Sequence, residues 1–420
     1  MKSIHLFPLA CLAVIAPALA QSPVSFEQPV VLQANALIPA ELLRGPSYRV
    51  RNEVVTDGFM AHFEIDSDYG TFEAIGVPQA KRRITESEAI KILVETSKGD
   101  LFAEGLKRSI DQPIAAVKNI VKDPVNSFKE APKTVVHFFS KAGSAIGRAA
   151  GKVSDRANSN EAPLSADEVG YNMGNAAKNV AGFDKAKLDT AKQLGVDPYS
   201  DNTRLQDEMD KVTWAFFAGG LPLRVGAAVA SAGMAVVATN MVGIPEDTYA
   251  LTQSELALRD GRSLASMGVT DKDIKQFQLY GPLSTTRRHR IVLALEALPN
   301  TRGRGRIIVQ ANGCETAENA EFLISALSIL AERQGSGAAN YVSLEVLGRL
   351  PGAINGAGEL EVPAPVDYVT WTEAVATFAK RDDLGTAPKV LVHTGTLSSA
   401  TRSGFTAAGW KILSVGHPAR

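Results

Sequence analysis

The sequence is poor in cysteine, and this limits how the fold can be stabilised. Only Cys11 and Cys314 occur in 420 residues. Because Cys11 falls in a segment that we expect to be removed on export, Cys314 is left alone and no internal disulfide can form. Packed cores must therefore stabilise the chain, even in a compartment that permits disulfides.

The chain also lacks a strong excess of either charge and the familiar catalytic motifs. Its formal net charge is −1, which gives no indication of nucleic-acid binding. HExxH, CxxC, GxSxG, a Walker loop and a Rossmann fingerprint are all missing. No motif therefore names a reaction, and we expect neither a metal site nor a bound cofactor.

The first twenty residues have the three-part pattern of a secretory signal peptide. Lys2 supplies the positive start, an uncharged run from Leu6 to Leu19 follows, and Ala18-Leu19-Ala20 is a small-x-small cleavage site. We expect cleavage before Gln21 and an exported protein, periplasmic or extracellular. A lipoprotein anchored at Cys11 is the weaker alternative.

Hydrophobic periodicity predicts an α+β fold with an N-terminal β-hairpin sheet, a predominantly helical middle and a C-terminal α/β unit. Residues 47–76 alternate as strands around the hairpin signal Asp57-Gly58. A capping box at Thr85-x-x-Glu88 predicts the first helix. A residue of the loop 197–202 should cap the helix that contains Leu205. The expected units are 1–20, the signal peptide; 21–160, the hairpin sheet and basic helices separated by prolines; 161–300, helices; and 301–420, a small α/β unit.

The C-terminal unit is expected to alternate strands with helices. The predicted strands are 306–311, 341–347, 359–362, 389–393 and 411–415, the predicted helices are 315–333, 370–381 and 398–408, and residues 351–358 are predicted to be a glycine-rich loop.

Two basic regions are candidate surfaces for anions or lipids. Basic residues outnumber acidic ones in 98–156, where short helices with an apolar face would suit an anionic membrane or would pack on the core. Its candidate lysines are Lys118, Lys122, Lys129 and Lys133. The second region contains Arg287, Arg288 and Arg290, followed by Arg302, Arg304 and Arg306. These arginines would contact phosphates or lie at a solvated helix end.

An uncharged segment raises the question of membrane insertion. Residues 225–244 contain no charged side chain and approach the length of a bilayer-spanning helix. Their Ala, Gly and Ser content gives little transfer free energy, however, and favours a buried helix of a soluble domain.

The candidate catalytic pair is Cys314 with His393. The predicted strand ends place both at one sheet edge, where ligands bind in open α/β sheets. The start of a helix would lower the thiol pKa, and Asp367 or Glu315 would orient the histidine. The alternative is a small apolar thiol beside a structural histidine. Residues 394–399 resemble an anion-binding helix start, but Ser398 or Ser399 as an ordinary helix cap explains them more simply.

These observations favour an exported, non-catalytic protein that binds an anionic membrane surface or an envelope protein, and no nucleic acid. One alternative is a hydrolase or transferase with its site at the strand ends of the C-terminal unit. The other is a protein that inserts into a membrane through residues 225–244.

The membrane hypothesis for the basic helices is testable by vesicle flotation. Replacing Lys118, Lys122, Lys129 and Lys133 by Glu should release the protein from anionic vesicles, because the charges would then repel the surface. If the unaltered protein does not float with the vesicles, these lysines do not bind a membrane.

Overall fold

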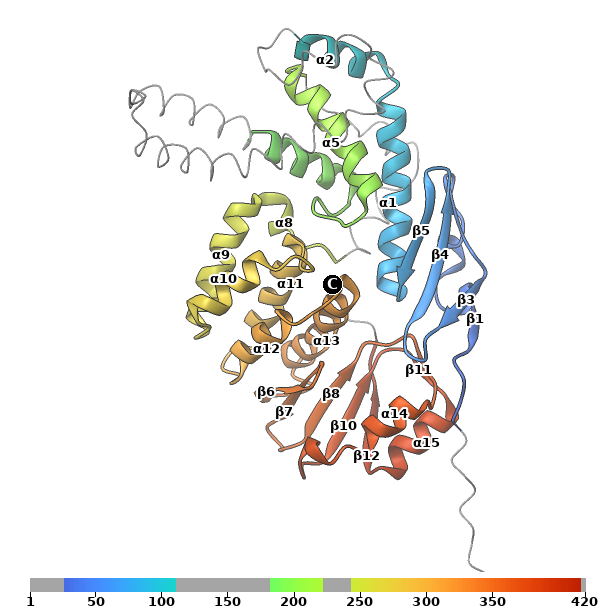
Figure 1. Ribbon diagram of the computed structural model, residues 1–420, viewed down its shortest axis with the longest axis vertical. Coiled ribbons are helices and arrows are strands. Elements are labelled where there is room, and N and C mark those ends of the chain that lie inside the picture. The colour runs from blue at the N-terminus through green and yellow to red at the C-terminus, as the bar shows by residue number, and fades with distance from the viewer. Residues whose placement is uncertain (1–25, 111–181, 222–242, 417–420) are drawn as a thin grey trace, which may run out of the picture.

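The computed structural model describes residues 26–110, 182–221 and 243–416. In chain order they form an N-terminal sheet, a group of helices and a mixed C-terminal sheet (Figure 1). The predicted α+β fold is confirmed. Lys118, Lys122, Lys129 and Lys133 lie outside the described residues, as do residues 225–242 of the uncharged segment.

The N-terminal sheet has five strands, and each pairing is antiparallel. Its central hairpin turns at Asp57-Gly58, as predicted. Gly58 has a φ of +97°, and Asp57 Oδ1 accepts the N–H groups of Phe59 and Met60 at 2.9 and 2.8 Å. The strands are β1 (Val31–Gln33), β2 (Tyr48–Val50), β3 (Glu53–Thr56), β4 (Ala61–Ser67) and β5 (Gly70–Ile75).

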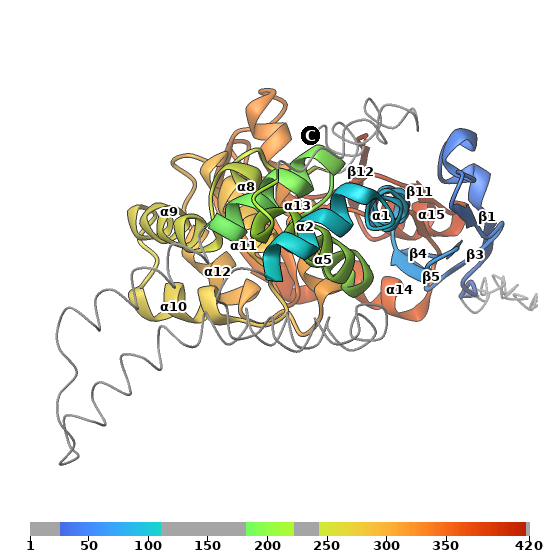
Figure 2. The same cartoon turned by 90° about the horizontal axis from the view of Figure 1, so that it is seen from above.

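Helix α1 (Val77–Thr96) lies beside this sheet (Figures 1 and 2). Ala80 and Ile84 pack in one core with Phe63. The predicted helix start at Thr85 is wrong. Pro78 in the first turn already has a helical φ and lacks an N–H that would need a partner. Thr85 lies inside the helix, where its hydroxyl donates to the Lys81 carbonyl at 3.1 Å.

The middle of the chain is helical, as predicted. Asn202 caps α5 by accepting the Leu205 N–H at 3.2 Å, which confirms the capping expected from the loop 197–202. The helices are α2 (Asp100–Ile110), one over residues 182–194, α5 (Thr203–Ala218), α8 (Asp247–Ala250), α9 (Gln253–Ser266), α10 (Asp271–Leu279), α11 (Thr285–Glu296), α12 (Arg304–Ala311) and α13 (Ala317–Gly335).

Helix α12 corrects the strand predicted over 306–311. Ile307, Ile308 and Ala311 are its buried residues, a spacing that fits one helical face but also occurs in a short buried strand. Gly303, directly before α12, allows the start of this helix to approach the backbone of the following sheet closely. It has a φ of +86°, and a Cβ added to it would lie 2.5 Å from the Leu344 carbonyl oxygen. Only glycine fits there without displacing the backbone.

The C-terminal sheet has the order β12-β10-β8-β7-β6. Strands β8, β10 and β12 are parallel, whereas β6, β7 and β8 pair antiparallel. The glycine-rich loop predicted at 351–358 is largely strand β7, which forms a hairpin with β6. The strands are β6 (Tyr341–Leu347), β7 (Leu350–Asn355), β8 (Leu360–Ala364), β10 (Lys389–His393) and β12 (Trp410–Ser414), and β9 (Tyr368–Val369) pairs separately with β11 (Thr396–Leu397).

Helices cover both faces of this sheet. Helix α13 contributes Ile329 to a cluster with Val390 and Val392. Helices α14 (Glu373–Ala379) and α15 (Ser399–Ala407) pack with Leu360 and Leu391 on the opposite face. The carboxyl ends of β8 and β10 therefore emerge between layers, next to the N-terminal sheet (Figure 1).

A backbone seam joins the N-terminal hairpin to the loop that follows β8. The N–H groups of Asp367 and Tyr368 both donate to the Phe59 carbonyl, at 3.0 and 3.2 Å, and Thr370 N–H donates to the Gly58 carbonyl at 3.1 Å. The seam fixes the tip of the hairpin above the strand ends.

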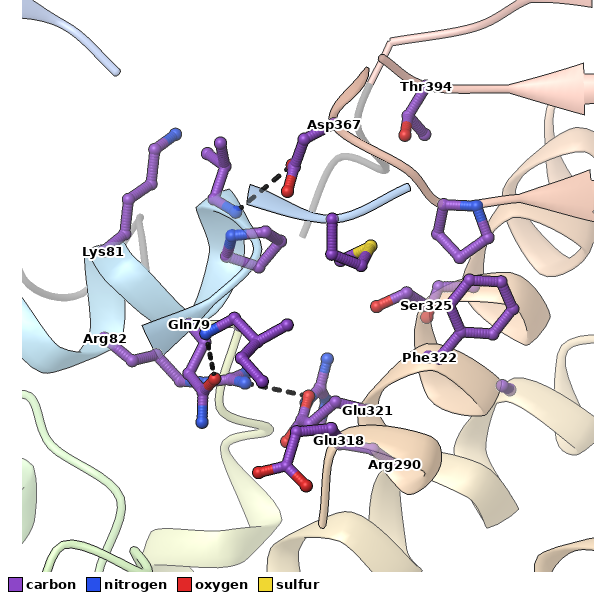
Figure 3. A pocket seen from close by; sticks show the side chains of 18 of the residues that line it. Gln79, Lys81, Arg82, Arg290, Glu318, Glu321, Phe322, Ser325, Asp367 and Thr394 are labelled. Carbon is purple, nitrogen blue, oxygen red and sulfur yellow. Dashed lines mark hydrogen bonds and ion pairs between the residues drawn. The ribbon is translucent and has the colours of Figure 1, made fainter. Parts of the chain in front are cut away.

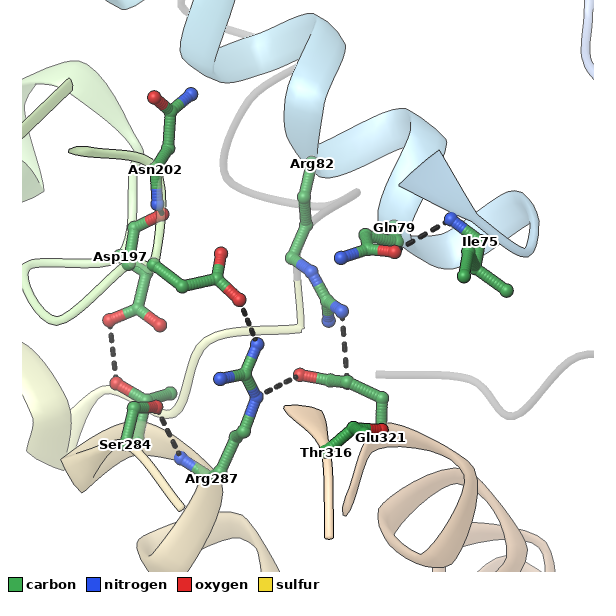
Figure 4. Close-up of polar contacts among 12 residues, drawn as sticks. Ile75, Gln79, Arg82, Asp197, Asn202, Ser284, Arg287, Thr316 and Glu321 are labelled. Atoms are coloured by element: carbon green, nitrogen blue, oxygen red, sulfur yellow. Dashed lines mark hydrogen bonds and ion pairs between the residues drawn. The ribbon is translucent and has the colours of Figure 1, made fainter. Parts of the chain in front are cut away.

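Glu321 on α13 is the centre of a network of ion pairs (Figure 4). Arg82 of α1 contacts its carboxylate at 2.9 Å, and Arg287 and Arg290 of α11 do so at 3.0 and 2.9 Å. Arg287 also binds Asp201 at 2.5 Å. Burial would raise the Glu321 pKa, but these three cations outweigh it and hold that pKa far below its usual range. The network thereby ties α1, α11 and α13 together.

These contacts correct both alternatives predicted for Arg287 and Arg290, an external anion and a solvated helix end. Arg287 is 8% exposed, and both guanidinium groups are used by internal carboxylates. The Arg288 guanidinium donates to the Leu283 carbonyl at 2.6 Å. Within the ranges described, no helix combines the length and apolar character needed to cross a bilayer.

Replacing Glu321 by Gln should lower the free energy of unfolding by about 3 kcal/mol, because three largely buried cations would lose their anion. Urea denaturation of the purified variant measures this loss. The matched control is Glu315→Gln, which removes an exposed ion pair with Arg349 and should cost less than about 1 kcal/mol. Equal losses in the two variants would contradict a central role for Glu321.

Candidate functional site

A cavity of about 760 Å³ with several charged and polar side chains in its lining lies where α1, α13 and the carboxyl ends of β8 and β10 meet (Figure 3). This volume lies within the range of small-molecule sites. The hairpin tip and the seam loop complete its wall. Its polar lining includes Lys81 and Arg82 from α1, Glu318, Glu321 and Ser325 from α13, and Asp367 and Thr394 from the strand ends.

A second cavity of about 760 Å³ is lined mainly by apolar side chains. The sheet contributes Val362 and Leu391, and helices α14 and α15 contribute Phe378 and Phe405. Cys314, between α12 and α13, also lines it.

The two cavities adjoin, because their linings share Asp57, Met60, Asn319 and Phe322. Asp57 and Met60 belong to the hairpin tip, and Asn319 and Phe322 belong to the first turns of α13. We call the whole the two-part cleft: polar around Glu318 and Asp367, and apolar around Val362 and Leu391.

Several polar groups in the two-part cleft have no partner among the residues that the structure describes. In the part of the chain that the structure describes, the Glu318 carboxylate, the Asn319 amide and the Ser325 hydroxyl form no hydrogen bond or ion pair. The carboxamide of Gln310 lines the apolar half, and its Nε2 and Oε1 atoms are both buried without a partner among the described residues. Glu318 and Asn319 are exposed and Ser325 is half-buried, so water can solvate them until an occupant binds. The Gln310 carboxamide is buried, and because buried polar groups normally pair, it is the group of this set that most needs an occupant.

Asp367 is the buried carboxylate of the polar half. It is 5% exposed, and it accepts the N–H groups of Ala61 at 2.9 Å and Val77 at 3.3 Å. Burial raises the Asp367 pKa to about 6, although the two N–H groups act in the opposite direction. Val77 is the first residue of α1, so this carboxylate also lies at the positive end of a helix dipole.

Cys314 and His393, the candidate catalytic pair, form no hydrogen bond with each other and have other partners. The Cys314 thiol lies between two helices and donates weakly to the Gln310 carbonyl at 3.9 Å. Burial raises its pKa, the opposite of the predicted lowering at a helix start. The His393 ring binds the Gly395 carbonyl at 2.8 Å, and burial lowers its pKa.

Neither predicted orienting residue contacts His393. Asp367 binds the N-terminal sheet, and Glu315 pairs with Arg349. In the segment 394–399, Ser398 is the helix cap that the simpler alternative predicted: it accepts the Thr401 N–H at 3.0 Å at the start of α15.

The sequence pointed to part of this site. The rule that ligands bind at strand ends indicated the neighbourhood of Asp367 and His393. Glu318, Phe322 and Met60 were missed, because nothing in their local pattern separates them from ordinary helix and turn residues. Among the described residues, no group of three His, Cys, Asp or Glu side chains is placed to hold a metal ion.

Comparison with protein-family models, curated proteins and solved structures finds no match for this chain.

The raised pKa of Asp367 predicts how stability depends on pH. Its folded-state pKa of about 6 exceeds the value of about 3.9 for an unfolded aspartate. The folded protein therefore binds the proton more tightly and loses stability as pH rises through this window. The loss attributable to this group is roughly 3 kcal/mol.

Asp367→Asn should remove this part of the pH dependence. The free energy of unfolding of the variant should therefore rise relative to that of the unaltered protein between pH 4 and pH 7. Urea denaturation at each pH gives the difference in free energy of unfolding. Asp382→Asn, at an exposed side chain, is the control and should keep the original slope. If Asp367→Asn leaves the slope of unfolding free energy against pH unchanged, Asp367 is not the source of this pH dependence.

Proposed function

We propose that this chain is an exported, non-catalytic binding protein that holds a small amphiphilic molecule in the two-part cleft. The observation that supports it best is the change in character along the cleft. An apolar chain would contact Val362, Leu391 and Phe378, and a polar head would reach Glu318 and Ser325.

The apolar half suits a hydrocarbon chain because burial of apolar surface is favourable without directional contacts. Its lining consists largely of branched and aromatic side chains from three layers of the fold. The buried Gln310 carboxamide adds one donor and one acceptor, which would suit an ester or amide group at the junction with the chain.

The polar half favours a head that donates hydrogen bonds. Glu318 at the cleft wall is a carboxylate with no partner in the described ranges, and Asn319 and Ser325 accept as well as donate. Arg82 and Arg290 are already bound to Glu321. A hydroxylated or ammonium head therefore fits better than a carboxylate.

The state of the thiol supports binding rather than catalysis. Nucleophilic cysteines act as thiolates, which need a lowered pKa or an adjacent base. Burial raises the Cys314 pKa, and the thiol contacts the carbonyl oxygen of Gln310.

Binding can be tested with N-phenyl-1-naphthylamine, a neutral probe that fluoresces in apolar surroundings. Ala374→Trp should weaken its binding about tenfold, equivalent to about 1.4 kcal/mol, because the indole would occupy the apolar half that Ala374 lines. Thr377→Trp is the matched control, since Thr377 is exposed on the same helix and does not line the cavity.

Competition with the probe then defines the head. Dodecyl maltoside and dodecylamine, each below its critical micelle concentration, should displace it better than laurate, which Glu318 would repel. Glu318→Gln should make laurate several-fold more competitive and leave dodecyl maltoside unchanged. Absence of probe binding, or equal effects of the two tryptophan variants, would overturn the proposal.

Alkylation reports the location of the bound probe. In a chain that begins at Gln21, Cys314 is the only thiol. Because Cys314 lines the apolar half, a bound chain should slow its reaction with iodoacetamide, measured by mass spectrometry. An unchanged rate at saturating probe would place binding elsewhere.

A further inference from the structure

Arginine and valine side chains gather at the opening of the apolar half of the cleft. Arg306 and Val309 of α12 line that cavity, as do Val346 at the end of β6 and Arg349 in the β6–β7 turn. Arg302 and Arg304 precede Arg306 around a shallow depression at the start of α12. We call these six residues the mouth surface.

The mouth surface carries positive charge that is not fully paired. Among the residues described, Arg302 and Arg304 have no side-chain hydrogen bond or ion pair. Arg306 contacts Glu345 at 3.2 Å and Arg349 contacts Glu315 at 3.0 Å, with arginine side chains 59% and 79% exposed. Such exposed pairs are weak and exchange readily for other anions.

The valines of the mouth surface are unusually accessible. Val309 is 55% exposed and Val346 is 37% exposed, yet both continue directly into the cavity lining. Exposed apolar side chains ringed by cations suit the boundary between headgroups and acyl chains. Guanidinium groups bind phosphate with two parallel hydrogen bonds.

We infer that the mouth surface docks this protein on an anionic phospholipid bilayer, with the arginines on headgroup phosphates and the valines at the acyl boundary. This goes beyond the proposed cleft ligand, since a docked protein would have the apolar opening against the source of amphiphiles. Docking needs no occupant in the cleft, so docking and ligand binding can fail separately.

The experiment is flotation of the purified protein with phosphatidylcholine vesicles that do or do not contain phosphatidylglycerol. The unaltered protein should float only with the anionic vesicles and should be released by high salt. Arg302→Glu combined with Arg304→Glu should reduce the bound fraction about tenfold. Val309→Gln should also weaken binding, because an apolar contact is lost while every charge is kept.

Matched controls lie on other parts of the surface. Arg402→Glu changes an exposed arginine of α15, and Leu101→Gln changes a 61% exposed apolar residue of α2, far from α12 in Figure 1. Both variants should float like the unaltered protein, and circular dichroism should be the same for all variants.

Three outcomes would overturn the inference. Failure of the unaltered protein to float with anionic vesicles excludes bilayer docking. Flotation that survives the double arginine variant but is lost in Leu101→Gln or in the lysine variants of 98–156 moves the contact to that segment. Loss with the arginine variant but not with Val309→Gln means a polyanion site without contact to acyl chains.

Discussion

The carboxylate of Glu321 is the interaction on which the arrangement of the helices around the cleft depends. Three arginines from two other helices converge on it, and each was removed from most of its water in doing so. A buried cation without an anion is costly, so α1 and α11 cannot move away from α13 one at a time. The same carboxylate lines the polar half of the cleft. Stability and the shape of the site therefore come from one set of contacts.

The apolar half of the cleft has a different origin. Strands β8 and β10 are covered on both faces by helices, so most of their side chains are apolar. The buried exception in β8 is Glu361, which pairs with Arg333 of α13. Where α13, α14 and the hairpin tip leave space over Val362 and Leu391, the cavity inherits that apolar character. The seam between the hairpin and residues 367–370 fixes the hairpin tip, which lines both the apolar and the polar half. The cleft is thus polar where charged side chains of α1 and α13 line it and apolar where the buried C-terminal sheet lines it.

Local signals predicted local features well. Asp57-Gly58 gave the hairpin, and Asn202 gave the start of α5, because both depend on conformations set by neighbouring residues. The helix start at Thr85 failed because Pro78 offered an earlier start with equal local support. The strand at 306–311 failed because Ile307 and Ile308 are buried in either secondary structure, and packing against β6 decides between them. With α12 a helix, Cys314 no longer follows a strand, so the reason for expecting it beside His393 at a sheet edge no longer applies.

The arginines show what a local sequence pattern cannot predict. Arg287 and Arg302 belong to the same basic region and look alike in a local reading. Arg287 finds Asp201, 86 residues before it, and Glu321, 34 residues after it, so its charge is used inside the fold. Arg302 has no such partner among the described residues and stays at the surface. A cation becomes part of a core or of a binding surface according to long-range pairing, and only the folded chain determines that pairing.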